Sequence, residues 1–185
     1  MKTDNKSEKR IIHVRNMNAH DIPEAVGAVG GLSLLQRYGV IKERLYETLA
    51  QGVSRGDRQL IGAWVDSESQ LKNSTDKGET FKNPGLPKRK FAGFALFSLC
   101  GTFLMSGYLK LLAVSPQMQG LGAGKALISK MESLVKKESR DLFLFVSDFN
   151  TTAKSFYEKV GYQKVGAVCG LILDDVTEEL YWKRL

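Results

Sequence analysis

The stretch Gln119-Gly120-Leu121-Gly122-Ala123-Gly124-Lys125 decides the fold, because a β-like run precedes it and an amphipathic pattern follows it. The apolar run from Tyr108 to Val114 is typical of a buried strand, and Pro116 separates this run from the glycines. After the glycines, apolar side chains recur at helical spacing to about Lys137. Backbone N–H groups at the start of such a helix point outward, and the helix dipole favours an anion there. The stretch therefore predicts a phosphate-binding turn between a strand and a helix.

Two common nucleotide-binding patterns do not match this turn. A P-loop requires Gly at its first position and Ser or Thr at its last, whereas this chain has Gln119 and Ala126 there. The dinucleotide pattern G-x-G-x-x-G fails as well, because its third glycine would fall on Lys125 or Leu127. The turn also lies late in the chain, outside a first strand–helix–strand unit. The sequence thus disfavours an ATP or nicotinamide site.

A second segment carries the other decisive pattern. It runs from Asn150 to Tyr162 and reads Asn-Thr-Thr-Ala-Lys-Ser-Phe-Tyr-Glu-Lys-Val-Gly-Tyr. Together with the glycine turn it resembles the GNAT superfamily of acetyl-CoA-dependent N-acetyltransferases. The turn matches that family's acyl-CoA signature (Gln or Arg, two residues, Gly, one residue, Gly or Ala), and the second segment matches its Asn, Ala, aromatic-Tyr and Gly-aromatic signature. The resemblance is strong from about Phe91 to Leu185, and earlier only the order strand–helix–helix–strand matches.

The resemblance implies roles for individual residues. The backbone of Leu112, Ala113 and Val114 would hold the pantetheine arm, in a gap where two strands splay apart. Asn150 would contact the cofactor arm, and Asn also suits the N-cap of the helix that follows. Tyr157 would be the general acid that gives a proton to the departing CoA thiolate. The amides from Gly120 to Lys125 would bind the pyrophosphate, and the cofactor-binding residues implied in the turn are Gln119, Gly120, Leu121, Gly122, Ala123, Gly124 and Lys125. The Lys125 side chain either adds charge there or faces solvent.

The general base is the part of the mechanism that no motif indicates. Many family members have Glu six residues before the Val of Val-x-Pro, and here that position is Tyr108, followed two residues on by Lys110. A relayed water, a carboxylate from elsewhere, or selective binding of the neutral amine would each serve instead. The carboxylates that could take this part are Glu43, Glu47 and Glu178. Candidate acceptor contacts, which equally suit ordinary helix packing, are Tyr38, Glu43, Tyr46 and Glu47.

The remaining pattern predicts one mixed α/β domain over residues 11–185, after a disordered tail at 1–10. Strands are expected at 11–15, 59–65, 91–99, 108–114, 142–146, 165–173 and 177–182. Helices are expected after the glycine turn, at 150–160, and as a pair joined near Gly30-Gly31 before Gln51. The resemblance implies a central, mostly antiparallel, twisted sheet of about six to seven strands, splayed at the cofactor site and flanked by about four helices. Segment 66–90 reads as an exposed loop, either a solvated insertion or a flap over a site.

Composition and charge limit the partners. Lys and Arg number 27 against 20 Asp and Glu, so the net charge of +7 favours anions, and an anionic cofactor accounts for part of it. No platform of alternating aromatic and basic residues predicts nucleic-acid binding. Two Cys and two His lack metal-ligand spacing, so no metal is expected. No apolar run reaches the roughly 20 residues of a membrane span, and the polar N-terminus lacks a signal-peptide pattern, so we expect a cytoplasmic protein without a membrane partner.

These observations predict an enzyme that moves an acetyl group from acetyl-CoA to a primary amine by direct attack on the thioester. The acceptor would be a small metabolite, a peptide or protein N-terminus, or a lysine. The alternative class is a module of the same fold that binds CoA without transfer and has a regulatory or interaction role. The retained Tyr157 argues against that alternative, and the missing strand carboxylate leaves it open. A homodimer is an expectation by analogy, because dimers are common in the family.

Overall fold

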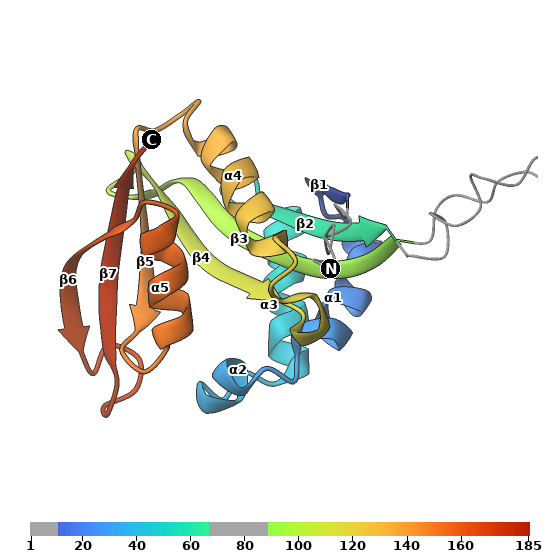
Figure 1. The fold of residues 1–185 in the computed structure, drawn as a ribbon, viewed down its shortest axis with the longest axis horizontal. Helices are drawn as coiled ribbons and strands as arrows, with labels where there is room; N and C mark the ends of the chain where they lie inside the picture. The colour runs from blue at the N-terminus through green and yellow to red at the C-terminus, as the bar shows by residue number, and fades with distance from the viewer. Residues whose placement is uncertain (1–10, 67–88) are drawn as a thin grey trace, which may run out of the picture.

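Seven strands form one twisted sheet in the computed structural model, which describes residues 11–66 and 89–185 (Figure 1). The strands are β1 (Ile12–Asn16), β2 (Gln59–Asp66), β3 (Arg89–Thr102), β4 (Ser106–Val114), β5 (Asp141–Ser147), β6 (Gln163–Cys169) and β7 (Thr177–Arg184). Their order in the sheet is β1-β2-β3-β4-β5-β7-β6. Every neighbouring pair is antiparallel except β4 and β5, which run parallel. The predicted mixed α/β fold with a mostly antiparallel sheet is confirmed.

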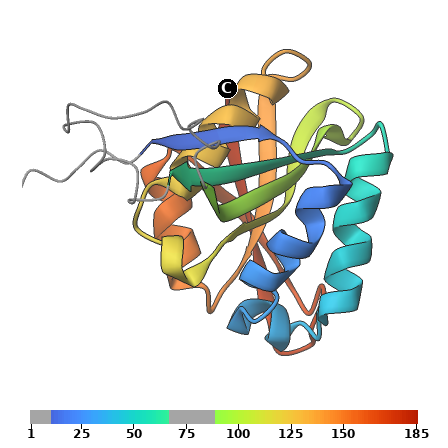
Figure 2. The ribbon, with the colours of Figure 1, turned by 90° about the vertical axis from the view of Figure 1, so that its right-hand side faces the viewer.

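Helices cover both faces of this sheet. They are α1 (Ile22–Val29), α2 (Ser33–Arg37), α3 (Lys42–Ser54), α4 (Ala123–Val135) and α5 (Thr151–Lys159). Figure 2 shows α1 and α3 side by side on one face, where they bury Ile22, Leu45 and Leu49 against the sheet. On the other face α4 buries Leu127 and Met131, which lie one helical turn apart. Two apolar cores, one on each face, therefore fix the sheet between the helices.

The segment before Gln51 forms one helix more than the sequence predicts. The first helix ends at Val29, beside Gly30-Gly31 as expected, but the rest is divided into α2 and α3. The division occurs at Gly39, whose φ of 63° is left-handed. The amide of Gly39 donates to the carbonyl of Gln36, and the amide of Val40 donates to that of Leu35. This pair of bonds is a Schellman ending, which stops α2 and turns the chain into α3.

Strands β4 and β5 pair only at their beginnings, which opens a gap in the sheet. Their ladder covers Gly107, Tyr108 and Leu109 on β4 and ends there. On the opposite edge of β4, Leu109 pairs with Phe97 and Leu111 pairs with Leu96, so Lys110 is the extra residue of a β-bulge. A bulge bends its strand and increases the local twist. The bulge coincides with the point where β4 leaves β5, and the predicted splay is confirmed.

Some predicted boundaries differ, and some predictions lie outside the described residues. Strand β6 ends at Cys169 instead of residue 173, because Gly170 adopts a φ of 65° and its amide turns back to the carbonyl of Val176. The tail at 1–10 and residues 67–88 of the expected loop are outside the described part, while Asp66 closes β2 and Arg89 opens β3. Among the helices that are described, none is long and apolar enough to cross a membrane.

Candidate active site

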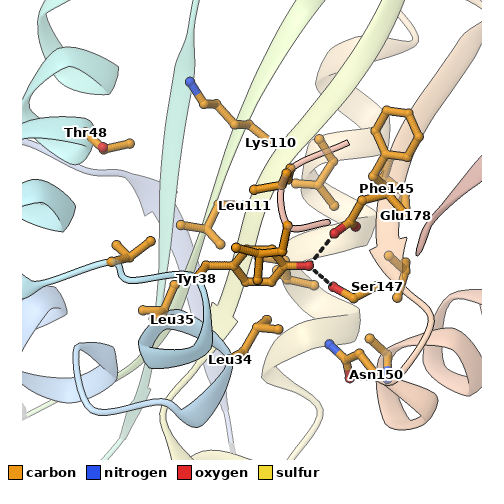
Figure 3. Close-up of a pocket in the computed structure, with 18 of the residues that line it drawn as sticks. Leu34, Leu35, Tyr38, Thr48, Lys110, Leu111, Phe145, Ser147, Asn150 and Glu178 are labelled. Carbon is orange, nitrogen blue, oxygen red and sulfur yellow. Dashed lines mark hydrogen bonds between the residues drawn. The ribbon is translucent and has the colours of Figure 1, made fainter. Parts of the chain in front are cut away.

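A cavity of about 670 Å³ lies where β4 and β5 part (Figure 3). Its walls come from α2, α3, β4, β5, α5 and the connection from β6 to β7. Predicted residues from both halves of the chain meet there, namely Tyr38, Leu112, Asn150, Tyr157 and Glu178. Leucine side chains from α2 and β4 make much of the remaining wall apolar. The sheet gap is therefore the centre of a site to which distant parts of the sequence contribute.

The glycine turn connects β4 to α4 and presents free amides. Gly120 and Gly122 have φ values of 75° and 90°, which side chains disfavour, and Gly122 is the N-cap of α4. Within the described ranges, the amides from Gly120 to Lys125 donate to no other group, while the amide of Ala126 is the first to bond within the helix, to Gly122. Outward amides at the start of a helix of this length can bind a phosphate. The Lys125 side chain is exposed beside them.

The three residues predicted to hold the pantetheine arm follow the bulge on β4. Leu112 lines the cavity. Ala113 and Val114 lie beyond it toward the glycine turn, and they pair with Phe94 and Gly93 of β3 on their other side. None of the three pairs with β5, so this part of β4 borders the gap. The strand thus runs from the cavity directly to the turn, and the three residues and the turn form one continuous edge.

Asn150, the N-cap of α5, and Tyr157, within α5, lie in the same cavity wall. Only 7% of Tyr157 is exposed, and burial raises the pKa of its phenol well above the usual value of 10. The rings of Phe156 and Tyr162 pack edge-on against it, with centroids 5.2 and 5.6 Å away, and fix its orientation. The side-chain oxygen of Asn150 accepts the Ala153 amide at 3.1 Å, which is the predicted N-cap.

Tyr38, Ser147 and Glu178 form a hydrogen-bonded group at the other end of the cavity. The Tyr38 hydroxyl donates to the Glu178 carboxylate and lies 2.6 Å from Ser147 Oγ (Figure 3). Burial, and next the hydrogen bond to Glu178, raise the pKa of Tyr38 to about 12. Glu178 is only 3% exposed. Tyr38 and Glu178 were candidates from the sequence, whereas Ser147, at the end of β5, carried no signal.

Helix α2 is held over this group by a cation. The guanidinium of Arg37 lies 3.9 Å from the centre of the Phe149 ring and 3.6 Å from the carboxylate of Asp175. Phe149 belongs to the turn after β5, and Asp175 precedes β7. The ring of Tyr38 also packs near Phe149, with centroids 6.3 Å apart. These contacts place Tyr38 in the cavity, and the sequence offers no pattern that predicts them.

The other acceptor candidates do not line the cavity. Glu43, Tyr46 and Glu47 are exposed on α3, and Arg44 and Thr48 face the cavity in their place. The last two are four residues apart, so one helical face carries both, a spacing that could have pointed to them. Tyr108 lies outside the lining, and burial, followed by the charge of Glu178, raises its pKa. Among residues 11–66 and 89–185, His, Cys, Asp and Glu form no cluster that could hold a metal.

Comparison with known proteins decides the family. Residues 58–170 match the family model of the acetyltransferase (GNAT) domain. The chain is a GNAT acetyltransferase. This GNAT enzyme is similar to the ribosomal protein bS18-alanine N-acetyltransferase of Haemophilus influenzae, with 34% identity over 125 residues, which cover 66% of this chain and 75% of the relative. The family predicted from the two motifs is confirmed, and the protein is an acetyl-CoA-dependent N-acetyltransferase.

Solved structures of GNAT proteins share the fold. An acetyltransferase from Thermus thermophilus superposes with a TM-score of 0.68 at 17% identity, over 94% of this chain and 97% of that one. An N-acetyltransferase from Thermoplasma acidophilum, crystallised with coenzyme A, gives a TM-score of 0.63 at 18% identity, over 95% of this chain and 99% of that one. Acetyl-CoA is the co-substrate of this GNAT enzyme, as predicted.

Proposed function

We propose that this GNAT enzyme transfers acetyl from acetyl-CoA directly to a primary amine, with Tyr157 as the general acid. The observation that carries the proposal is the position of Tyr157 in the wall of the cavity at the β4–β5 gap, together with Leu112. Because burial raises the pKa of Tyr157, its phenol stays protonated at neutral pH and has a proton to give. Among the described residues no hydrogen-bond partner competes for this phenol, so its proton is available to a leaving thiolate.

The reaction has few steps. The amine nitrogen attacks the thioester carbonyl, and a C–N bond forms. Negative charge develops on the carbonyl oxygen, and a backbone amide such as that of Val114 would stabilise it. The C–S bond then breaks, and the thiolate takes the phenolic proton of Tyr157. The nitrogen loses a proton as the amide forms, so Tyr157 can be protonated again and the cycle closes.

We further propose that the glycine turn holds the cofactor and that the acceptor is the α-amine of a peptide or protein. The amides from Gly120 to Lys125 are free and begin a helix, which supports a pyrophosphate site at Gln119–Lys125. Leu112, Ala113 and Val114 would bond the pantetheine arm along the open edge of β4, and Asn150 would reach it from α5. The relative from H. influenzae is a ribosomal protein bS18-alanine N-acetyltransferase, and alanine has no side-chain amine, which favours an α-amine of a peptide or protein over a small metabolite or a lysine.

The proposal is tested with the full chain. Acetyl-CoA binding is measured by calorimetry, and thiol release is measured with an Ala-initiated peptide, the same peptide blocked at its N-terminus, a lysine peptide and small amines. Tyr157→Phe should lower kcat by about 10²–10⁴-fold and leave the Kd of acetyl-CoA within about twofold. Tyr46→Phe, on the exposed face of α3 at 44% exposure, is the matched control and should behave as the wild type.

Each result has a defined meaning. Full turnover in Tyr157→Phe would remove Tyr157 from the mechanism. Acetyl-CoA binding without thiol release on any amine would favour the silent CoA-binding module. Release with the lysine peptide or the small amines, and none with the Ala-initiated peptide, would overturn the α-amine acceptor alone.

A further inference from the structure

Glu178 is a buried carboxylate that faces the cavity without a cationic partner. It is 3% exposed, and no Lys, Arg or His among the described residues forms an ion pair with it. Its neighbour Glu179, which points to the opposite face of β7, is paired with Lys154 at 3.5 Å and Lys164 at 2.8 Å. Buried charges in proteins are normally paired. The two adjacent carboxylates therefore differ in that only Glu178 is open to a cation from outside the chain.

The surroundings of Glu178 hold it in place without neutralising it. The phenol of Tyr38 has one proton and donates it to Glu178, so the hydroxyl of Ser147 donates to the Tyr38 oxygen. Because the pKa of Tyr38 is raised to about 12, this donor stays neutral at physiological pH. Neither contact cancels the charge of the carboxylate. A group aimed in this way, in the cavity that holds Tyr157, suits an incoming ammonium.

Positive charge lies on another wall of the same cavity. Its only described basic lining residues are Arg44 and Lys110. In Figure 3 Lys110 extends from β4 away from Tyr38, toward the side of Thr48. Partial burial, followed by repulsion from Arg58 and Arg55, lowers the pKa of Lys110, and Glu178 is not among the charges that act on it. No described carboxylate pairs with Lys110 or Arg44.

This positive wall is not part of the turn that binds the cofactor phosphates. Lys110 is the bulge residue of β4, and the strand continues to Val114 before the turn begins. At about 3.3 Å per residue, those residues alone place Lys110 roughly 13 Å from the end of the strand. The charges near Lys110 are therefore available to the acceptor instead of the pyrophosphate.

We infer that Glu178 binds the ammonium group of the acceptor and accepts its proton, and that Lys110, on another wall of the same cavity, selects acceptors that also carry an acidic group. This inference rests on the proposed direct transfer and names its acceptor class. The described lining of the cavity has one carboxylate and two cations, which suits a monoamine and disfavours polycations, because these need several carboxylates.

The proton transfers balance. Glu178 takes one proton from the ammonium, and the nitrogen lone pair then attacks the thioester. Tyr157 protonates the thiolate, and the second proton of the nitrogen restores Tyr157. Glu178 returns its proton to solvent, so one proton is released for each amide and thiol formed.

The test uses full-length enzyme and two peptides without lysine that begin Ala-Asp and Ala-Asn. The wild type should show a kcat/KM about fivefold higher for Ala-Asp, the effect of a single partly exposed ion pair. Lys110→Met should reduce this ratio to about one. Alanine and alaninamide form a second pair, in which preference for free alanine would assign the acidic group to an amino acid instead of a peptide.

The Glu178 half of the inference has its own readout. Glu178→Gln should lower kcat/KM about 100-fold for both peptides at pH 7 and leave the Kd of acetyl-CoA unchanged. Its remaining activity should rise about tenfold per pH unit until the α-amine loses its proton near pH 8, because only the neutral amine then reacts. Glu43→Gln, exposed on α3, is the control. Its kcat/KM for each peptide, and the ratio of the Ala-Asp value to the Ala-Asn value, should match the wild type.

The outcomes separate this inference from the proposed function. Wild-type turnover in Glu178→Gln would overturn the role of Glu178, and an unchanged Ala-Asp preference in Lys110→Met would overturn the role of Lys110. Neither result would affect the test of Tyr157 as the general acid. A wild type that prefers Ala-Asn overturns the acceptor class. Failure of the wild type to acetylate any amine overturns both proposals.

Discussion

Tyr38 donates a hydrogen bond to Glu178 although 140 positions separate the two residues in the sequence. The bond joins α2 to β7 across the cavity, and Arg37 adds a second link through Asp175. Neither element contributes to the glycine turn. The proposed acceptor end of the site therefore depends on contacts between the first and last parts of the chain. The edge of β4 and the glycine turn, where we propose that the cofactor binds, follow one another in the sequence.

Tyr38→Phe is expected to weaken acceptor binding and leave cofactor binding intact. The change removes one hydrogen bond to a charged group, worth about 1.5 kcal/mol, so the KM for the acceptor should rise roughly tenfold. The Kd of acetyl-CoA, measured by calorimetry, should not change, because the glycine turn is untouched. If the KM for the acceptor and the Kd of acetyl-CoA both rose, α2 would support the whole site and not the acceptor end alone.

The two motifs proposed to form the cofactor end could be recognised in the sequence because each is a contiguous stretch. The glycines from Gly120 to Gly124 and the segment 150–162 each carry their own spacing in the sequence. In the structure the start of the second segment and Tyr157 line the cavity at the β4–β5 gap, and the glycine turn follows the end of β4. The bulge at Lys110 could not be predicted, since an extra residue is defined only against the partner strand β3. Ser147 was missed for a similar reason, because its role depends on Tyr38, which Gly39 and Arg37 position from another part of the chain.

Alkaline stability is expected to depend on Tyr38. In the unfolded chain a tyrosine ionises near pH 10, whereas the pKa of folded Tyr38 is raised to about 12. Between these values the unfolded state binds fewer protons than the folded state, so the free energy of unfolding falls as pH rises. Below pH 10 the contribution is fully present. Tyr38→Phe should therefore flatten the fall in urea midpoint between pH 10 and 12, and an identical slope in variant and wild type would contradict the assignment.

Gly122→Ala is expected to damage both the turn and cofactor binding. Gly122 has a φ of 90°, so an alanine there should cost about 1–2 kcal/mol of stability and tilt the free amides at the start of α4. The KM for acetyl-CoA should rise, while the KM for the acceptor should change little. Gly27→Ala in α1, where an added Cβ meets nothing within 4 Å, is the control and should raise the melting temperature slightly. Equal effects of the two alanines would exclude a special role for the Gly122 backbone.

Gly93→Ala tests whether the edge of β4 holds the cofactor arm. A Cβ on Gly93 would lie 2.4 Å from the carbonyl oxygen of Ala113 and 3.0 Å from the Cα of Val114, so β3 and β4 must move apart there. Overpacking of this kind costs about 1–3 kcal/mol, which should lower the melting temperature by roughly 2–12 °C in a chain of this length. Because Ala113 and Val114 border the gap, acetyl-CoA should also bind more weakly. Gly56→Ala, with open space around it, should change neither quantity. A lower melting temperature with unchanged acetyl-CoA affinity would mean that the arm does not depend on the position of β4 at these two residues, and its site would then have to be sought closer to Leu112.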